Sequence, residues 1–256
     1  MKVITLNANG IRAALKKGLL DWLKKENADF ICLQETKLQM KEVVDAYQIE
    51  GYHLFHHDAL KPGYSGVAIY SKHKPKKVIV GLGFPIADDE GRHIRLDIDN
   101  FSIISIYLPS GSSSEARQQV KFEFMKFYEP YLKKLIKSGR DVIICGDWNI
   151  VHQRIDIKNW SGNQKHSGCL PEERAWLHYL LTKVNWVDAF RMLNQEADQY
   201  TWWSQRGQAR AKNVGWRIDY QMVTPSLGDK IKSVSIYKET KLSDHAPVIV
   251  EYDYTI

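Results

Sequence analysis

The amino-acid sequence predicts a soluble α/β protein with mixed β-strands and helices. Short runs rich in β-branched residues recur along the chain, and longer segments with helical apolar periodicity separate some of them. Over 256 residues, a composition of 44% hydrophobic and 26% charged residues is sufficient for a buried core. Too many strand candidates follow one another directly, as in hairpins, for a purely parallel doubly wound sheet.

The strand candidates are residues 2–7, 29–34, 65–71, 93–98, 102–108, 141–146, 215–224 and 246–252. Helices are expected at residues 11–25, 114–137 and 171–184, and the last begins with a proline that a first turn tolerates. No internal repeat or linker rich in Pro, Gly or Ser divides the chain. We therefore expect residues 1–256 to form a single domain.

Charge and cysteine content narrow the class of protein. The excess of 36 Lys and Arg over 30 Asp and Glu favours a polyanionic partner, although a solvated lysine face would give the same excess. No apolar run reaches about 18 residues, so we expect neither a membrane span nor classical secretion. Cys32, Cys145 and Cys169 lack CxxC spacing, which predicts a reducing cytoplasm with neither disulfides nor zinc.

Acidic and amide side chains recur where the apolar runs end, and a histidine precedes the last run. If the strands lie side by side, these ends converge on one rim, with hard oxygen ligands for Mg²⁺ or Mn²⁺ beside one imidazole. Each such residue taken alone is more often a turn former or helix cap, but several together make that alternative weaker. The residues are Asn7, Glu35, Asp147, Asn149, Asp244 and His245.

Such a cluster suits phosphate chemistry. A divalent ion held by one or two carboxylates leaves positions open for phosphate oxygens and neutralises charge in the transition state. Asp147 could then orient or deprotonate water, and His245 could hold the phosphate.

Other catalytic motifs fit poorly. The segment 63–67 nearly spells a nucleophile elbow, but Val67 stands where G-x-S-x-G requires glycine. The serine-rich loop 109–114 lacks the G-K-[ST] ending of a P-loop, and Ser112 with Glu115 has the spacing of a capping box. His56 and His57 lack the context of a catalytic zinc site.

An aromatic and basic tract covers residues 200–220. Aromatic faces there could stack on bases while cations meet phosphates; the alternative is a tryptophan-rich core with a solvated hairpin tip. The tract contains Trp202, Trp203, Trp216, Arg206, Arg210, Lys212 and Arg217.

A series of motifs resembles the exonuclease III and AP endonuclease family in order and spacing, and it spans essentially the whole chain from Asn7 to His245. The motifs are Leu33-Gln34-Glu35-Thr36-Lys37, Gly63-Tyr64-Ser65-Gly66, Gly146-Asp147-Trp148-Asn149, Trp216-Arg217-Ile218-Asp219-Tyr220 and Ser243-Asp244-His245. The resemblance implies a four-layer α/β sandwich of two packed mixed sheets flanked by helices. It also implies a Mg²⁺-dependent DNA repair hydrolase.

The resemblance further implies roles for matching residues. The family's metal site falls on Glu35, with Asn7 and Asp244 close by. Asp147 corresponds to the water-activating aspartate, and Asn149 to the asparagine that binds the phosphate oxygen or the attacking water.

Phosphate binding is implied for a second group of matching residues. His245 corresponds to the phosphate-binding histidine and Asp219 to the carboxylate that orients it. Tyr107 matches the family tyrosine placed against the scissile phosphate.

Departures from the family pattern concern substrate preference. Ser110 replaces the asparagine of Y-x-P-N, so a shorter hydroxyl stands where an amide would donate to phosphate. His166, in the segment 162–168, stands where AP endonucleases of the family often have asparagine beside the abasic strand. Trp202 matches a smaller aromatic residue of the abasic sugar pocket. The other residues expected at the DNA are Trp216, Ile218, Asn163 and Arg206.

We therefore expect 3′ to 5′ exonuclease or 3′-end trimming activity to outweigh incision at abasic sites. The expected partner is double-stranded DNA with 3′ ends, nicks or abasic sites, bound by a monomer. The alternatives are a dominant AP endonuclease, a superfamily phosphodiesterase acting on inositol phosphates or sphingomyelin, and a non-catalytic nucleic-acid binding protein.

Overall fold

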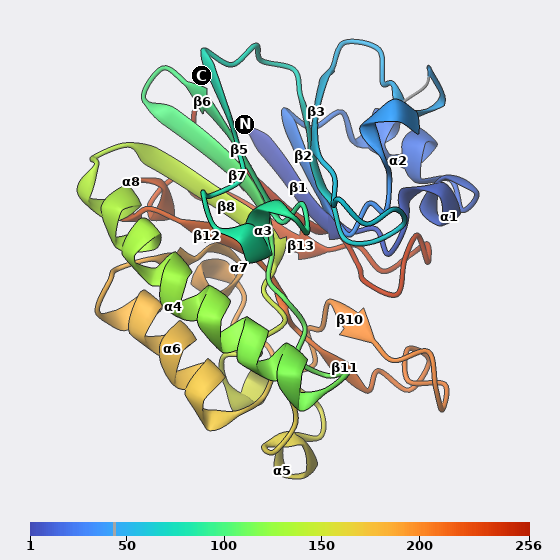
Figure 1. Cartoon of the computed structure of the whole chain (residues 1–256), viewed down its shortest axis with the longest axis vertical. Helices are drawn as coiled ribbons and strands as arrows, with labels where there is room; N and C mark the ends of the chain where they lie inside the picture. Colours follow the sequence, from blue (N-terminus) through green and yellow to red (C-terminus); the bar gives the residue numbers. More distant parts are fainter. Residues whose placement is uncertain (43–44) are drawn as a thin grey trace.

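The computed structural model describes residues 1–42 and 45–256, and its centre is a pair of six-stranded sheets packed against each other (Figure 1). Side chains from both sheets, among them Cys32, Ile69, Ile103 and Cys145, form one fully buried core cluster. Helices cover the outer faces of the two sheets. The predicted α/β sandwich of two mixed sheets flanked by helices is confirmed.

The first sheet contains both ends of the chain. Its strand order is β13 (Ile231–Ile236), β14 (Val248–Tyr252), β1 (Lys2–Asn7), β2 (Phe30–Gln34), β4 (Val67–Ser71) and β3 (His53–His57). Only the β1 and β2 pair is parallel among these neighbours. The central strands are buried almost throughout because one face meets the second sheet and the other meets helices.

The second sheet brings Tyr107, Asp147 and Asp219 together at one edge. Its order is β5 (Lys77–Val80), β6 (His93–Ile98), β7 (Phe101–Tyr107), β8 (Asp141–Asp147), β12 (Asp219–Val223) and β9 (Val187–Asp188). The parallel pairing of β7 with β8 ends at Tyr107 opposite Asp147. The antiparallel pairing of β12 with β8 begins at Asp219 opposite Asp147. Three chemically active side chains thus meet at one edge.

Two long helices, α4 (Glu115–Lys137) and α6 (Pro171–Thr182), pack on the outside of the second sheet, and α1 (Ile11–Leu15) with α2 (Leu19–Glu26) pack on the first (Figure 1). Ser114 caps α4 by accepting a hydrogen bond from the Arg117 amide.

The remaining elements are short: α3 (Pro85–Asp88), α5 (Trp160–Asn163), α7 (Ala189–Leu193), α8 (Pro225–Gly228), the 3-10 turns Met40–Glu42, Asp45–Tyr47 and Arg154–Asp156, and a two-stranded sheet of β10 (Trp202–Trp203) and β11 (Gly215–Trp216).

Some expected elements are divided in the structure. The helix expected over residues 11–25 is interrupted because Gly18 adopts a left-handed φ of 87° between α1 and α2. The strand expected over residues 215–224 ends after Trp216 and resumes at Asp219.

Strands β3, β5 and β13 were not predicted, and all three are edge strands. An edge strand exposes many of its side chains, so its sequence carries less of the apolar signal that identifies a central strand. Within the described parts of the chain, no helix is long and apolar enough to cross a bilayer. Cys32, Cys145 and Cys169 are buried free thiols.

Candidate active site

A cavity of about 790 Å³ opens at the edge where the strand ends of the two sheets meet. Most of the residues singled out from the sequence line it. They are Asn7, Glu35, Tyr107, Ser110, Asp147, Asn149, Asn163, His166, Trp202, Trp216, Ile218, Asp244 and His245. Two predicted residues do not line the cavity: Asp219 lies behind His245, and Arg206 is on an exposed loop between β10 and β11.

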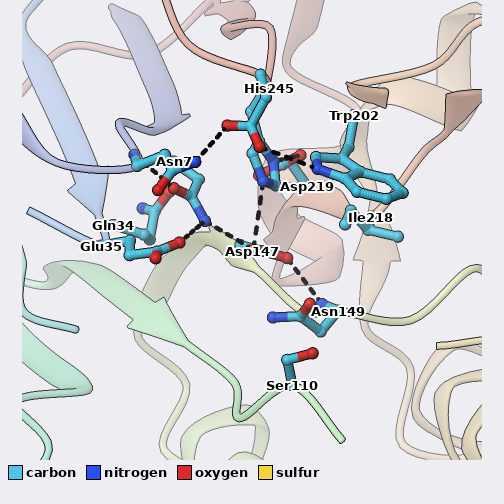
Figure 2. Close-up of polar contacts among 12 residues, drawn as sticks. Asn7, Gln34, Glu35, Ser110, Asp147, Asn149, Trp202, Ile218, Asp219 and His245 are labelled. Atoms are coloured by element: carbon cyan, nitrogen blue, oxygen red, sulfur yellow. Dashed lines mark hydrogen bonds and ion pairs between the residues drawn. The ribbon is translucent and has the colours of Figure 1, made fainter. Parts of the chain in front are cut away.

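Asp147 lies at the centre of this arrangement, between Asn7 and Glu35 on one side and His245 with Trp202 on the other (Figure 2). Its Oδ2 accepts a hydrogen bond of 2.9 Å from Asn7 Nδ2, which crosses from one sheet to the other. Its Oδ1 accepts a hydrogen bond of 2.8 Å from the backbone N–H of Asn149. The carboxylate is therefore fixed in orientation from both sides.

Asn149 occupies a sharp turn directly after β8. Its φ of 53° is in the left-handed region, which asparagine tolerates better than most residues. The side-chain amide donates to the Leu108 carbonyl at 3.0 Å. This contact holds the Asn149 side chain between the ends of β7 and β8, against the cavity.

His245 and Asp219 form a buried ion pair, with 2.9 Å between His245 Nδ1 and Asp219 Oδ2. Burial alone would lower the pKa of His245, but the charge and hydrogen bond of Asp219, with the charges of Asp147 and Asp244, raise this pKa to about 10. The ring is therefore an imidazolium at neutral pH. Its Nε2 lies 3.9 Å from Asp147 Oδ2 and lines the cavity.

Burial, and next the neighbouring charge of Asp219, raise the pKa of Asp147 to about 7. The charge of His245 and the hydrogen bonds from Asn7 and Asn149 act in the opposite direction without cancelling the effect. Asp147 therefore titrates near neutral pH, and any additional cation in the cavity would favour its ionised form.

Glu35 follows β2 and brings a second carboxylate to the cavity. Its Oε2 accepts from Asn7 Nδ2 at 3.1 Å and from the Tyr107 hydroxyl at 3.2 Å, and its Oε1 is 3.0 Å from Lys37 Nζ. Burial and the charge of Glu35 raise the pKa of Tyr107 well above its usual value, so the phenol remains a neutral donor. Lys37 also donates to Asn9 at 2.7 Å.

The donor atoms of Asp147, Asp219 and His245 lie within 4.8 Å of one another, as they would around a metal ion. In this structure His245 Nδ1 is paired with Asp219 at 2.9 Å, so the cluster forms an array of ion pairs. Oxygen donors of the cavity wall fit a hard cation better, and the Glu35 carboxylate is the most direct candidate.

The other two expected ligands are oriented less directly. Asn7 turns its amide nitrogen toward Glu35 and Asp147, while its Oδ1 accepts from the Asn9 amide at 2.8 Å. The Asp244 carboxylate accepts from Asn9 Nδ2 at 3.0 Å and from Trp202 Nε1 at 3.4 Å. Coordination by Asn7 would therefore require its amide to rotate.

Aromatic side chains form one wall of the cavity. Trp202 and Trp216 meet edge to face, with ring centroids 6.0 Å apart, and pack with Ile218. Trp202 also lies beside His245, with centroids 6.4 Å apart. Trp203, in contrast, is buried in a separate cluster and does not reach the cavity.

Arg217 does not line the cavity, so for this residue the structure fits the alternative interpretation of the aromatic tract as part of the core. It is completely buried, with Nε 2.7 Å from Asp156 Oδ1 and Nη2 2.6 Å from Asp188 Oδ2. This network fixes the backbone between Trp216 and Ile218. Sequence reasoning missed this structural role, and the only available signal was a charged residue within an otherwise apolar run.

Comparisons with known proteins find a matching family, similar sequences and similar folds. A model of the endonuclease/exonuclease/phosphatase family matches residues 4–245. The chain is 40% identical over 251 residues to an exodeoxyribonuclease of Bacillus subtilis, and the match covers 97% of this chain and 98% of that protein.

Solved structures are similar over almost the entire chain. An AP endonuclease from Archaeoglobus fulgidus superposes with a TM-score of 0.90 at 28% identity, over 99% of this chain and 100% of that one. A 3′-5′ exonuclease from Neisseria meningitidis superposes with a TM-score of 0.88 at 26% identity, over the same shares of the two chains.

Proposed function

Because the chain belongs to the endonuclease/exonuclease/phosphatase family, we propose that it is a Mg²⁺-dependent DNA repair nuclease that trims 3′ ends of duplex DNA. It is a hydrolase of DNA phosphodiester bonds, as its similarity to exodeoxyribonucleases indicates. The observation that carries the mechanism is the central Asp147 carboxylate, held by Asn7 and facing the His245 imidazolium at 3.9 Å.

In the proposed reaction Asp147 is the general base. Its pKa of about 7 suits proton transfer near neutral pH. As the oxygen of a water molecule bonds to phosphorus, a proton of that water passes to Asp147. The P–O bond to the leaving group breaks with its electron pair on the leaving oxygen, which then takes up a proton from solvent water. Asn149, fixed against the Leu108 carbonyl, orients the water or a phosphate oxygen.

Charge that accumulates on the phosphate is met by cationic and neutral donors. The His245 imidazolium is oriented by Asp219 and presents Nε2 to the cavity, where it would stabilise a phosphate oxyanion. The Tyr107 hydroxyl adds a neutral donor near the same position.

We assign the metal site to Glu35, with Asn7 and Asp244 as further oxygen donors. A bound Mg²⁺ would neutralise phosphate charge and orient the phosphate oxygens, and Mn²⁺ would be a substitute with similar ligand preferences. The oxygen-rich donor set of the cavity supports this assignment.

The preference for 3′ ends is supported by the walls of the cavity. Trp202, which by the family resemblance replaces a smaller aromatic residue of the abasic sugar pocket, packs beside Trp216 and Ile218 on one wall of the cavity. His166 and Ser110 line the same cavity, and the imidazole is bulkier than the asparagine that abasic-site enzymes of the family often carry.

Incision at abasic sites is the second candidate activity, and the similarity to the Archaeoglobus fulgidus AP endonuclease favours it. We further propose that residues 1–256 act as one catalytic domain in a monomer. Buried free thiols support a reducing compartment such as the cytoplasm. Duplex DNA carrying 3′ ends, nicks or abasic sites is the proposed partner, and Asn163 and Arg206 are proposed to contact it.

A cleavage panel tests the proposal. End-labelled duplexes with a recessed 3′ end, a nick, a 3′-phosphate or an abasic site are incubated with Mg²⁺, Mn²⁺ or EDTA. We expect cleavage with either metal, none with EDTA, and faster release from recessed 3′ ends than incision at the abasic site. Much faster abasic cleavage would overturn the preference.

Substitution of the central carboxylate tests the mechanism in the same panel. Asp147→Asn should bind DNA and fold normally but lose cleavage, because the amide cannot accept the water proton. Asp99→Asn, at an exposed turn, is the matched control and should retain parent activity. Retained turnover in Asp147→Asn would refute the assigned base.

A further inference from the structure

A completely buried ion pair is hydrogen-bonded to residues that line the cavity. Lys121 of α4 and Glu173 of α6 have side chains that are 0% exposed, and their Nζ and Oε1 atoms are 2.6 Å apart. Removing two charges from water is costly, so such a pair persists only where further hydrogen bonds compensate it. The partners of this pair show what it holds together.

On one side, Lys121 Nζ donates to the Asn149 carbonyl oxygen at 2.8 Å. On the other, Glu173 Oε2 accepts from the Gly168 amide at 2.6 Å and from the Leu170 amide at 3.1 Å. The ion pair therefore links the turn that carries Asn149 to the segment 163–170, which brings Asn163 and His166 to the cavity.

The turn and the segment are also in direct contact. The Val151 amide donates to the Gly168 carbonyl at 2.8 Å. Gly168 has a φ of +90°, and a Cβ atom added there would lie 2.9 Å from the Asn149 carbonyl oxygen and 3.0 Å from Trp216 Cζ3. This close packing leaves the Asn149 carbonyl oriented toward Lys121.

The conformation of Asn149 needs such support. Its left-handed φ of 53° is costly for a residue other than glycine and persists where surrounding contacts determine it. A cationic donor fixed on the Asn149 carbonyl oxygen is a contact of this kind. Because Lys121 is itself held by Glu173, movement of α4, α6 or the segment 163–170 would be transmitted to the turn.

We propose that Lys121 is a positioning residue, which through its ion pair with Glu173 fixes Asn149 for the chemical step and holds the segment with His166 against the cavity. This inference rests on the proposed nuclease function and assigns a role to residues outside the cavity wall. Lys121 does not touch DNA, since it is completely buried.

The kinetic test uses Lys121→Met together with the double variant Lys121→Met/Glu173→Gln. The double variant leaves no unpaired buried charge, and the glutamine side-chain oxygen can still accept a hydrogen bond from the Gly168 or Leu170 amide, so the fold is expected to survive. Because misplaced reacting groups slow chemistry, we expect kcat on a 3′-recessed duplex to fall on the order of ten- to a hundredfold. KM should change less than kcat, because His245 and Tyr107 are unchanged and only the segment with Asn163 is loosened.

Arg95→Met is the matched control. It breaks a partly buried ion pair with Asp97 on β6, away from the residues that line the cavity. We expect a lower melting temperature for this variant but parent kcat, which separates a loss of positioning from a general loss of stability.

A second readout does not depend on DNA cleavage. Lys165 is exposed within the segment 163–170, so trypsin cleavage after it reports how firmly the segment is held. We expect faster cleavage at Lys165 in the double variant than in the parent or in Arg95→Met. This measurement tests whether the Lys121–Glu173 ion pair holds the segment even if the parent protein fails to hydrolyse DNA. Such a failure would refute the nuclease function alone. A folded double variant with parent kcat and the parent cleavage rate at Lys165 would overturn the inference.

Discussion

Replacing Asp219 by asparagine removes one charge from the site with almost no change in side-chain size. Asp219 is buried, and its Oδ2 lies 2.9 Å from His245 Nδ1. Asparagine keeps an acceptor for that hydrogen bond but not the charge that favours the imidazolium. Since burial alone lowers the pKa of His245, this pKa should fall steeply in the variant.

The size of the expected fall in the His245 pKa follows from how far this pKa is raised in the parent protein. The difference between the ordinary imidazole value of 6.5 and about 10 corresponds to about 5 kcal/mol in favour of the protonated ring. If most of this is lost, His245 is largely neutral at pH 8, and the phosphate loses a charged donor. Loss of such a donor lowers the cleavage rate on the order of a hundred- to a thousandfold.

The same substitution should act on Asp147 in the same direction. Burial and then the charge of Asp219 raise the pKa of Asp147, so at acidic pH, where His245 is still protonated, removal of the Asp219 charge lowers this pKa and extends base function to lower pH. For Asp219→Asn we therefore expect both limbs of the pH–rate profile to move toward acid. The basic limb, which belongs to His245, should move further.

The measurement is single-turnover cleavage of a 3′-recessed duplex from about pH 5 to about pH 10, with ring titration of His245 by NMR. Asp99→Asn serves as the control for a change of net charge alone. A His245 ring that still titrates near 10 in the variant, or a pH–rate profile identical to that of the parent, would refute the reasoning.

Three further substitutions give independent tests. Burial opposes ionisation of Asp156, but Arg217 helps to hold its pKa at about 2, so this pair stabilises the fold fully above about pH 4 and loses its effect as the pH falls toward 2. Asp156→Asn should therefore cost about 3–5 kcal/mol at neutral pH in urea unfolding, and the difference from the parent should shrink in acid; a constant difference would contradict this. Gly146→Ala should destabilise the protein by about 1–3 kcal/mol, because the new Cβ would lie 2.3 Å from the Ile106 carbonyl oxygen, and an unchanged urea midpoint would argue against that clash. His166→Asn should raise abasic incision relative to 3′-end trimming, and an unaltered ratio of the two rates would exclude His166 as a determinant of substrate choice.

Periodicity and composition predict the centre of this fold better than its borders. Strands such as β2 and β8 are continuous apolar runs because both of their faces are buried, and they stand out in the sequence. Edge strand β5 reads Lys77-Val78-Ile79-Val80, too short and too exposed to be separated from a loop. The break at Gly18 depends on one left-handed residue, which periodicity alone does not reveal.

The candidate site was predictable to the extent that it consists of strand ends. Asn7, Glu35 and Asp147 each end or follow a buried strand, so their convergence follows once the strands are neighbours. Partners distant in sequence were not predictable, because the pairing of Lys121 with Glu173 arises only when α4 and α6 pack on the same sheet. An isolated charge in an apolar segment signals burial but does not identify its partner.

The hydrogen bond from Asn7 to Asp147 crosses the junction between the two sheets, and this has a consequence for folding. Neither sheet holds a complete set of reacting groups, so a partly folded chain with only one sheet assembled has no means of cleaving DNA. Recovery of nuclease activity during refolding therefore marks the moment at which the sheets dock, and it should lag behind the recovery of secondary structure.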